Sequence, residues 1–178
     1  MNLPVISADP VTIWFSGLSG AGKTTLAHAL ERKLNAFGKK CIVLDGDKVR
    51  SGLNSDLGFS VSDRSENIRR VAELAKLIND SGFVVISALI SPFESDRNMA
   101  RQIIGAARFR EVYISTPLDV CESRDVKGLY KRARQGEIQG FTGVTSPFEP
   151  PRQADVVLDT SCMDIDCCVD LIFIQTCS

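Results

Sequence analysis

Two hydrophobic periods alternate along the chain. Short apolar runs rich in β-branched residues are typical of buried strands, and they are separated by longer segments with helical spacing of apolar positions. The expected strands are Val11–Ser16, Cys41–Asp45, Phe83–Ala88, Glu111–Ser115 and Val156–Asp159. The expected helices are Thr24–Phe37, Ser62–Ser81, Ser95–Ile104, Leu118–Arg124, Gly128–Gln135 and Asp164–Gln175.

Strands that alternate with helices favour parallel pairing through right-handed crossovers. The predicted fold class is therefore α/β: a three-layer sandwich with a mostly parallel sheet, formed as a single domain over residues 1–178. Ligands bind such sheets at the carboxyl ends of the strands. The Gly- and Pro-rich region 135–153 reads as a long closing loop, and residues of about 125–150 are expected to form a lid.

Composition narrows the class of protein. The 178 residues are 44% hydrophobic and 24% charged, with a formal net charge of −1, which is typical of a soluble globular chain. The lack of a basic excess argues against a nucleic-acid or membrane-surface partner. The apolar runs are too short for a transmembrane helix, and residues 1–7 lack the pattern of a signal peptide.

Cysteine usage argues against a zinc site. The chain has six cysteines, no C-x-x-C pair and one histidine, His28, whereas structural zinc sites need clustered Cys and His ligands. Without a secretory signal, reduced thiols and a cytoplasmic location are expected. A redox-sensitive tail stays open as an alternative, because four cysteines lie in the last 17 residues.

A phosphate-binding loop follows the first expected strand. Residues 17–24 match G-x-x-x-x-G-K-[ST] between a strand and a helix, as the P-loop requires. In order they are Gly17, Leu18, Ser19, Gly20, Ala21, Gly22, Lys23 and Thr24. Backbone N–H groups and the helix N-terminus would bind phosphate oxygens, Lys23 would reach the β- and γ-phosphates, and Thr24 would ligate Mg²⁺. The loop predicts a nucleoside triphosphate donor.

Two acids follow the second expected strand. In Leu44-Asp45-Gly46-Asp47, one carboxylate can hold Mg²⁺ through water and the other can take a proton from an attacking hydroxyl. No acid ends the strand 83–88, so Asp45 is the expected metal-side acid. The chain has no N-K-x-D motif, which argues against a GTPase.

Basic and aromatic residues suggest an anionic, base-containing acceptor. Basic residues occur after the acid pair, in the expected helix 62–81 and in the lid, and together they favour an anion site. They are Arg50, Arg64, Arg69, Arg70, Lys127, Lys131, Arg132 and Arg134. Phe59 and Phe141 lie in polar loops, where such rings can stack on a nucleobase.

These segments resemble the adenylylsulfate (APS) kinase family. The similar segments span about residues 11–160 and keep the family order. Besides the P-loop they are Leu44–Asp47, Asp56–Ser60, Asp63–Arg64, Glu66–Arg70, Ile90–Phe93, Lys127–Tyr130 and Gly140–Gly143. Segment 124–143 and the pairs Ser161-Cys162 and Asp166-Cys167 are most similar to the kinase part of bifunctional 3′-phosphoadenosine 5′-phosphosulfate (PAPS) synthases. No sulfurylase domain is expected in these 178 residues.

The resemblance implies that ATP phosphorylates the 3′-hydroxyl of APS to give PAPS, with Mg²⁺ and usually as a homodimer. It implies that residues 17–25, including Thr25, bind ATP, with Cys162 and Cys167 near its base. The implied APS-binding residues are Asp47, Arg50, Phe59, Arg64, Asn67, Ile90, Ser91, Lys127, Gly140 and Phe141. It makes Asp47 the base, Lys23 a catalytic residue and Asp45 the acid that assists the metal. An association with ATP sulfurylase is a further expectation.

Ser91 carries a phosphoserine label in the family. An in-line transfer needs only alignment and charge neutralisation, and no adjacent base activates Ser91 as a nucleophile. We therefore expect Ser91 to bind or position substrate.

Two other functions remain open at this point. One is another small-molecule P-loop kinase, such as a gluconate- or nucleotide-kinase relative. The other is a non-catalytic nucleotide-binding module of a sulfate-activating complex. Phe59, Arg64 and Asn67 argue against the first, and intact Lys23, Thr24, Asp45 and Asp47 argue against the second.

Overall fold

A parallel sheet forms the centre of the computed structural model, which describes residues 10–177. In that part of the chain, five strands lie in the order β2-β3-β1-β4-β5. They are β1 (Thr12–Ser16), β2 (Cys41–Asp45), β3 (Val84–Ala88), β4 (Phe109–Ile114) and β5 (Val156–Leu158). After β1 the chain adds β2 and β3 on one side of it and then β4 and β5 on the other. The carboxyl end of β1 therefore lies at the point where the strand order reverses, which is where this type of sheet binds ligands.

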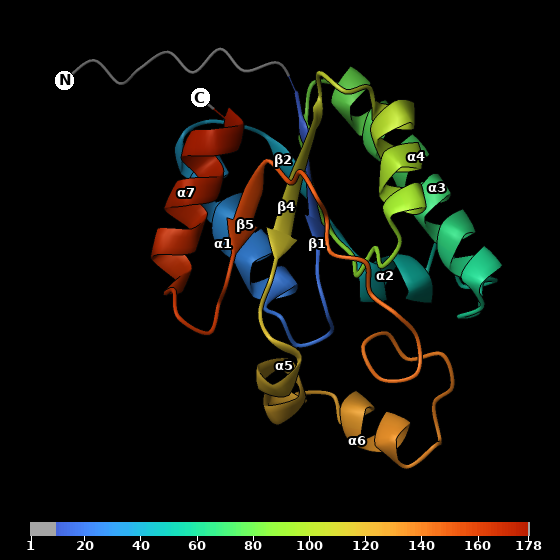
Figure 1. Ribbon diagram of the computed structural model, residues 1–178. Coiled ribbons are helices and arrows are strands. Elements are labelled where there is room, and N and C mark those ends of the chain that lie inside the picture. Colours follow the sequence, from blue (N-terminus) through green and yellow to red (C-terminus); the bar gives the residue numbers. More distant parts are fainter. Residues whose placement is uncertain (1–9, 178) are drawn as a thin grey trace.

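Helices cover both faces of the sheet (Figure 1). Helices α1 (Lys23–Ala36) and α7 (Ile165–Cys177) pack together on one face. Helices α3 (Val61–Asp80) and α4 (Glu94–Ile104) pack together on the other. The α/β three-layer sandwich predicted from the sequence is thus confirmed.

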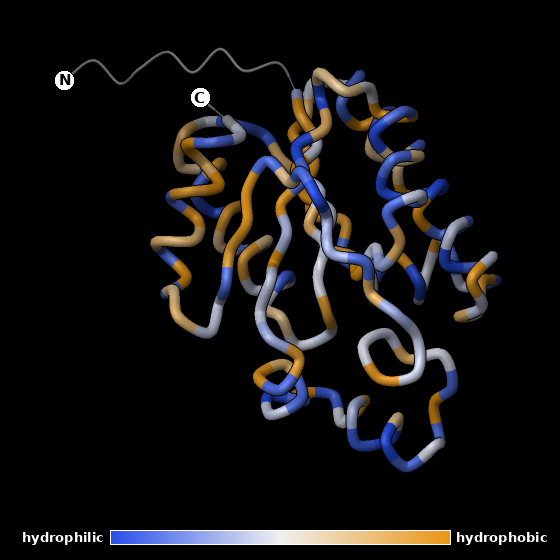
Figure 2. Tube along the Cα trace, viewed as in Figure 1, coloured by the Kyte–Doolittle hydropathy of each residue, from blue (hydrophilic) through white to orange (hydrophobic). Residues whose placement is uncertain are grey.

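Each face of the sheet has its own apolar cluster. The side chains of β1 alternate between the clusters, as the two-residue period of a strand requires. Ile13 and Phe15 face the cluster with α1 and α7, whereas Trp14 faces the cluster with α3 and α4, where its ring lies 5.6 Å from that of Phe109. Figure 2 shows apolar positions concentrated on the strands and on the inward sides of the helices.

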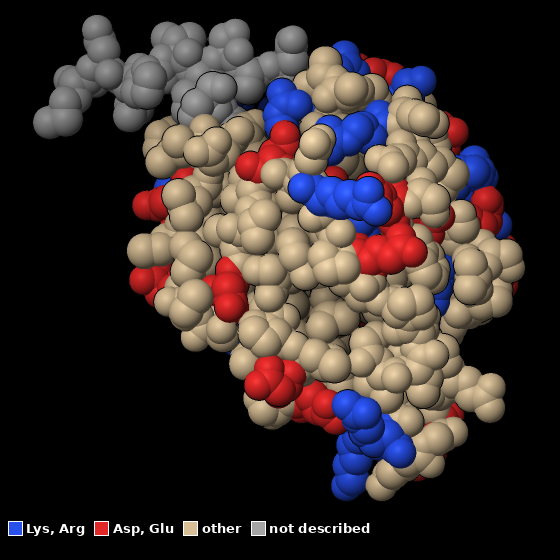
Figure 3. All heavy atoms as spheres, viewed as in Figure 1, with Lys and Arg blue, Asp and Glu red and all other residues tan. Residues whose placement is uncertain are grey.

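Three short helices lie at the carboxyl ends of the strands. They are α2 (Gly46–Ser51), α5 (Leu118–Arg124) and α6 (Leu129–Arg134). After α6 the chain runs through a long loop before β5, and this loop lies beneath the sheet in Figure 1. Figure 3 shows basic side chains at the tip that α6 occupies, in agreement with its three basic residues, Lys131, Arg132 and Arg134.

The expected elements exist, with shifts of one or two residues at their ends. One helix was missed: α2 has six residues and buries only Val49, so it has no apolar period to detect. The expectation for residues 1–7 and the side chain of Cys177 lie outside the part that the structure describes. Within that part, no helix is long and apolar enough to cross a membrane.

Candidate active site

The P-loop encloses a buried lysine between β1 and α1. Gly17 has φ 144°, and an added Cβ would lie 2.6 Å from the Ile114 carbonyl oxygen, so this position needs glycine. Lys23 Nζ donates to the carbonyl oxygens of Gly17 (2.8 Å) and Leu18 (2.6 Å). Burial lowers the pKa of Lys23 to about 8. The charge thus lies inside the loop, where the phosphates of a nucleotide would bind.

Asp45 ends β2 and faces the first turn of α1. The Thr24 hydroxyl donates to Asp45 Oδ2 at 2.7 Å, and the amides of Asp47 and Lys48 donate to Oδ1. Burial by itself raises the pKa of Asp45, but these hydrogen bonds lower it overall. Asp45 is therefore an ionised, fixed carboxylate beside the P-loop and also the N-cap of α2.

Asp47 lies two residues further on, in the first turn of α2, with its side chain largely exposed. Its Oδ2 pairs with Nζ of Lys127, which comes from the segment between α5 and α6. The two residues are 80 positions apart in the sequence, so their contact brings part of the expected lid to the acids at the end of β2. One acid is thus locked beside the P-loop while the other is accessible.

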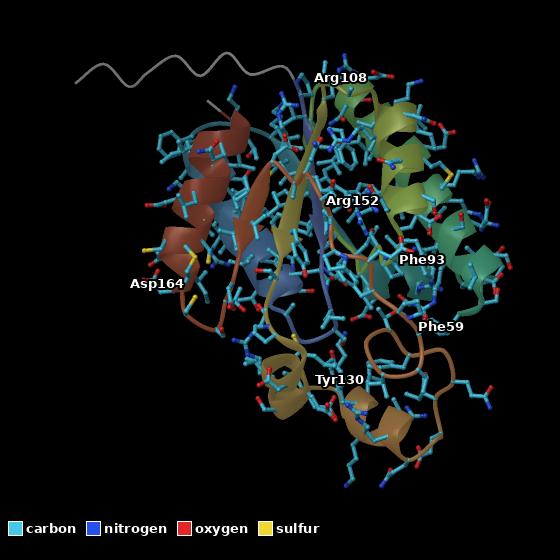
Figure 4. The ribbon with its side chains drawn as sticks, in the orientation of Figure 1. Phe59, Phe93, Arg108, Tyr130, Arg152 and Asp164 are labelled. Carbon is cyan, nitrogen blue, oxygen red and sulfur yellow. The ribbon has the colours of Figure 1, made fainter. Side chains whose placement is uncertain are left out.

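Phe59, labelled in Figure 4, lies before α3, and two arginines lie near its ring. The Arg50 guanidinium carbon is 4.5 Å from the ring centroid, and that of Arg64 is 5.8 Å away. Arg64 Nη2 also donates to the carbonyl oxygen of Gly140 at 2.6 Å, and its Nη1 donates to the Thr142 hydroxyl. Arg64 therefore joins the start of α3 to the long loop.

Asn67 and Phe141 are buried beside this group. Asn67 Oδ1 accepts a hydrogen bond from Asn54 Nδ2 at 2.9 Å. Phe141 meets Tyr130 edge-on, with ring centroids 5.0 Å apart, and is 8% exposed. Phe59, by contrast, is 64% exposed. Of the two rings expected to stack on a base, one is open to solvent and the other is mostly covered in the unliganded chain.

Ile90 and Ser91 form the turn after β3. The Ile90 carbonyl oxygen accepts a hydrogen bond from the Gly17 amide at 3.2 Å, which ties this turn to the P-loop. Ser91 is buried, and its Oγ accepts a hydrogen bond from Trp14 Nε1 at 3.0 Å. The Ser91 hydroxyl is therefore engaged with the core.

Cys162 and Cys167 lie apart from the acids, in the turn after β5 and in α7. Both side chains are exposed, and Cys162 Sγ lies 3.5 Å from the Asp159 carbonyl oxygen. The structure brings this turn to the P-loop through a residue that sequence reasoning missed: Arg124 donates to the carbonyl oxygens of Gly20 and Thr160. In the sequence, the one sign of this role was that Arg124 stands at the end of an expected helix that follows a strand.

The long loop also packs on the P-loop. Gly143 has φ 89°, and an added Cβ would lie 3.0 Å from Leu18 Cδ2 and 3.1 Å from Leu118 Cδ1. Beside this contact is a hollow of about 590 Å³ whose lining includes Leu18, Tyr113 and Phe148. The loop therefore contacts the donor side of the site through Leu18 and the acceptor side through Arg64.

A parallel sheet with a P-loop after its central strand β1 and acids after the edge strand β2, with β3 between the two, defines a P-loop kinase. A family model described as adenylylsulphate kinase matches residues 9–159. The chain therefore belongs to the adenylylsulfate kinase family, a family of phosphotransferase enzymes.

Relatives in sequence agree with this family. An adenylyl-sulfate kinase of Bacteroides thetaiotaomicron is 57% identical over 162 residues, which cover 91% of this chain and 81% of the relative. One of Marinobacter nauticus is 56% identical and covers 90% of this chain and 81% of its own.

Solved structures also agree. The Mycobacterium tuberculosis APS kinase CysC in complex with AMPPNP and APS has a TM-score of 0.92 and 45% identity, over 96% of this chain and 99% of that one. A gluconokinase of Sinorhizobium meliloti, with a TM-score of 0.57 and 15% identity over 94% of this chain and 92% of its own, shares the fold alone.

Proposed function

We propose that this chain transfers the γ-phosphoryl group of ATP to the 3′-hydroxyl of APS, giving ADP and PAPS. The observation that carries the proposal is the placement of Lys23, Asp45 and Asp47 beside the group of Phe59, Arg50 and Arg64. Lys23 and Asp45 fit a triphosphate donor with its cation, Asp47 fits a base for the acceptor hydroxyl, and the second three residues fit an anionic nucleotide acceptor. The bound AMPPNP and APS of the M. tuberculosis relative add support.

In this reaction the 3′-oxygen forms a bond to the γ-phosphorus while the bond between that phosphorus and the oxygen bridging to the β-phosphate breaks. Asp47 takes the proton of the 3′-hydroxyl, because its carboxylate is accessible beside the P-loop. Lys23 leaves the carbonyl oxygens of Gly17 and Leu18 to neutralise the β- and γ-phosphates. ATP is held by residues 17–25, Thr25 included, with Cys162 and Cys167 near its base.

The proposed APS-binding residues surround Phe59. Arg50 and Arg64 provide positive charge next to its ring, so the adenine can stack where these cations now lie. Ser91 positions the turn, since its hydroxyl already bonds to Trp14. The remaining proposed members are Asp47, Asn67, Ile90, Lys127, Gly140 and Phe141.

Thr24 and Asp45 are the residues that would hold Mg²⁺. A hydroxyl and an ionised carboxylate 2.7 Å apart at the phosphate end of the P-loop are oxygen donors of the kind Mg²⁺ prefers, with water completing its shell. No group of three or more His, Cys, Asp or Glu side chains suited to a metal occurs in residues 10–177, which agrees with a cation held largely by water and substrate. Bound Mg²⁺ neutralises phosphate charge in such kinases.

Larger-scale features complete the proposal. The chain would act as one domain with a lid of about residues 125–150, as a homodimer in the cytoplasm, and an association with ATP sulfurylase would supply its substrate. Neither a nucleic acid nor a membrane is a proposed partner.

A coupled ADP-release assay tests the function. APS, gluconate and AMP are offered as acceptors in parallel with ATP and Mg²⁺, and the nucleotide product is identified by mass. Turnover with APS alone and a product of PAPS mass are expected. Turnover only with gluconate or AMP would identify another small-molecule kinase, whereas ATP binding without any turnover would identify a nucleotide-binding module.

A further inference from the structure

Arg97 in α4 is 2% exposed, the lowest value among the charged side chains that the structure describes. Its Nη1 donates to the Ser91 carbonyl oxygen and its Nη2 to the Glu149 carbonyl oxygen, each at 2.8 Å. Its Nε lies 2.8 Å from Oε1 of Glu111 in β4. One planar group therefore joins the turn after β3, the end of the long loop, and the sheet.

The turn that Arg97 holds is strained. Ser91 has φ 45°, in the left-handed region that favours glycine, and such a conformation costs roughly 1–3 kcal/mol in general. Trp14 holds its hydroxyl and Arg97 holds its carbonyl oxygen. Because the preceding carbonyl, of Ile90, accepts from the Gly17 amide, the strained turn also fixes the start of the P-loop.

The long loop ends on the same turn. The Glu149 amide donates to the Pro92 carbonyl oxygen at 2.8 Å, and its Oε2 accepts from the Glu94 amide at 2.7 Å. Phe148, one residue earlier, stacks on Tyr113 with ring centroids 5.7 Å apart, and the Arg97 guanidinium carbon is 6.0 Å from its ring. The loop is thus fixed at Glu149, whereas Gly140 and Phe141 belong to the part that reaches Arg64, one of the three proposed acceptor-binding residues Arg50, Phe59 and Arg64, called here the acceptor group.

We infer that Arg97 is a positioning residue that makes Ser91 and Glu149 a fixed pivot, about which the lid presents Gly140 and Phe141 to the acceptor. This inference rests on the proposed function, because the acceptor is APS. Arginine suits the task since its three nitrogens are spread over a rigid plane, so they can reach two carbonyl oxygens and a carboxylate at separate points, whereas the three donors of lysine share one nitrogen. The charge is compensated by Glu111, as a buried cation requires.

Arg97→Lys tests the pivot, with Arg101→Lys as a matched control. Arg101 lies about one turn further along α4, 3.4 Å from Glu111 and stacked 4.6 Å over Phe109, and these contacts involve neither Ser91 nor Glu149. Arg97→Lys should raise KM for APS by about tenfold or more and change KM for ATP by less than about twofold. Arg97 bonds directly to the loop at Glu149, whereas the P-loop meets this segment only through the Ile90 carbonyl oxygen, which Arg97 does not contact. The control should change neither constant by more than about twofold.

A second measurement needs no turnover. Hydrogen exchange at the amides of Glu149 and Glu94, which both donate within the pivot, should be at least about tenfold faster in Arg97→Lys and unchanged in the control. The inference would be overturned if KM for APS and KM for ATP changed by the same factor in Arg97→Lys and in Arg101→Lys. It would also be overturned if exchange at the Glu149 amide were unchanged in Arg97→Lys. If wild type fails to phosphorylate APS, the proposed function fails, and the exchange result still decides whether Arg97 holds the pivot.

Glu149→Ala covers the case in which Arg97→Lys does not fold. This side chain is exposed and its loss removes the bond to the Glu94 amide, so folding should persist. A rise of about threefold in KM for APS is expected. An unchanged KM for APS in this variant would contradict the pivot.

Discussion

At the scale of single residues, Asp45 and Asp47 differ in burial, and this difference suits the two acids to different roles. Asp45 is 5% exposed and its carboxylate accepts three hydrogen bonds, so it stays ionised and cannot move. Asp47 is exposed and bonds to the lid residue Lys127, so a substrate can displace its partner. A fixed acid suits a cation, and an accessible one suits proton transfer.

Asp47→Asn should lower kcat for APS by at least ~10²-fold, because an amide cannot accept the proton of the hydroxyl. Steady-state kinetics with ATP and APS measure the effect. Asp80→Asn is the matched control, since Asp80 is an exposed acid that likewise pairs with a basic residue, Arg108. Near wild-type kcat in Asp47→Asn would remove Asp47 from the role of base.

The affinity for ATP should fall as pH rises above about 8. Burial lowers the pKa of Lys23 from 10.5 to about 8 in the free protein, so the charge that attracts phosphate is present below this pH and is lost above it. Calorimetric titration with ATP and Mg²⁺ from pH 7 to 9.5 should show Kd rising by up to about tenfold per unit beyond pH 8. Lys23→Arg should flatten the profile because arginine stays charged; a flat wild-type profile would contradict the assignment.

The same titration affects folding in a defined direction. A lysine whose pKa is lower in the folded chain than in the unfolded chain disfavours folding below pH 8, and this penalty is relieved as pH rises from 8 to 10.5. The Lys23 position thus stores a cost that phosphate binding can offset.

At the scale of elements, the apolar pattern predicted nearly every helix and strand, because the long helices bury one face and the central strands bury both. The helix over residues 61–80 shows this best, since Ile68, Val71, Ala72 and Ala75 are all buried. The short α2 escaped prediction because its start is set by a side chain, Asp45, and not by packing. The periodicity of apolar residues reveals elements that bury a face. It does not reveal a short helix such as α2, whose first turn is held by the N-cap residue Asp45.

An ionic group joins α3 to the loop before it. Arg70 donates to both carboxylate oxygens of Asp56 and to Glu66. Hydrogen bonds from Arg69 and Arg70 lower the pKa of Glu66 to about 2. Because this value lies below the usual 4.5, the group stabilises the fold above pH 4.5 and loses that contribution as pH falls toward 2.

Glu66→Gln should therefore lower Tm slightly at pH 6 and have a smaller effect at pH 3, where wild type has begun to lose the contribution. Scanning calorimetry at both pH values measures it, with and without 1 M NaCl, because salt screens exposed pairs. Glu73→Gln, whose contact with Arg69 is 3.8 Å long, is the control. An equal loss of Tm at both pH values would show that Glu66 acts through packing.

At the scale of the whole molecule, the acceptor group is assembled from segments far apart in sequence. Arg64 and Gly140 are 76 residues apart, and Arg97 and Glu149 are 52 apart. Arg50, Phe59 and Arg64 were predicted as acceptor-site residues from their charge or aromatic character and from the resemblance, but their contacts with one another could not be predicted. Arg97, which is buried, and Arg124, which is exposed, were both missed because the sequence alone does not show which groups a helical arginine contacts.

Phe59→Ala should raise KM for APS by about tenfold or more and leave Tm nearly unchanged. Stacking of a base on an aromatic ring is worth about 1–3 kcal/mol, whereas a ring that is 64% exposed contributes little to the core. Val61→Ala is the matched control, since Val61 is a nearby apolar residue that is 66% exposed. An unchanged KM for APS would place the adenine elsewhere.

The pairing of Lys127 with Asp47 has a consequence for timing. In the structure, the proposed base Asp47 is paired with Lys127 from the proposed lid. On the proposed function, an acceptor that brings its own negative charge would draw Lys127 away and release Asp47 at the moment when a hydroxyl is in place. The ion pair would thereby couple the availability of the base to the arrival of the correct substrate and would limit the hydrolysis of ATP before that substrate binds.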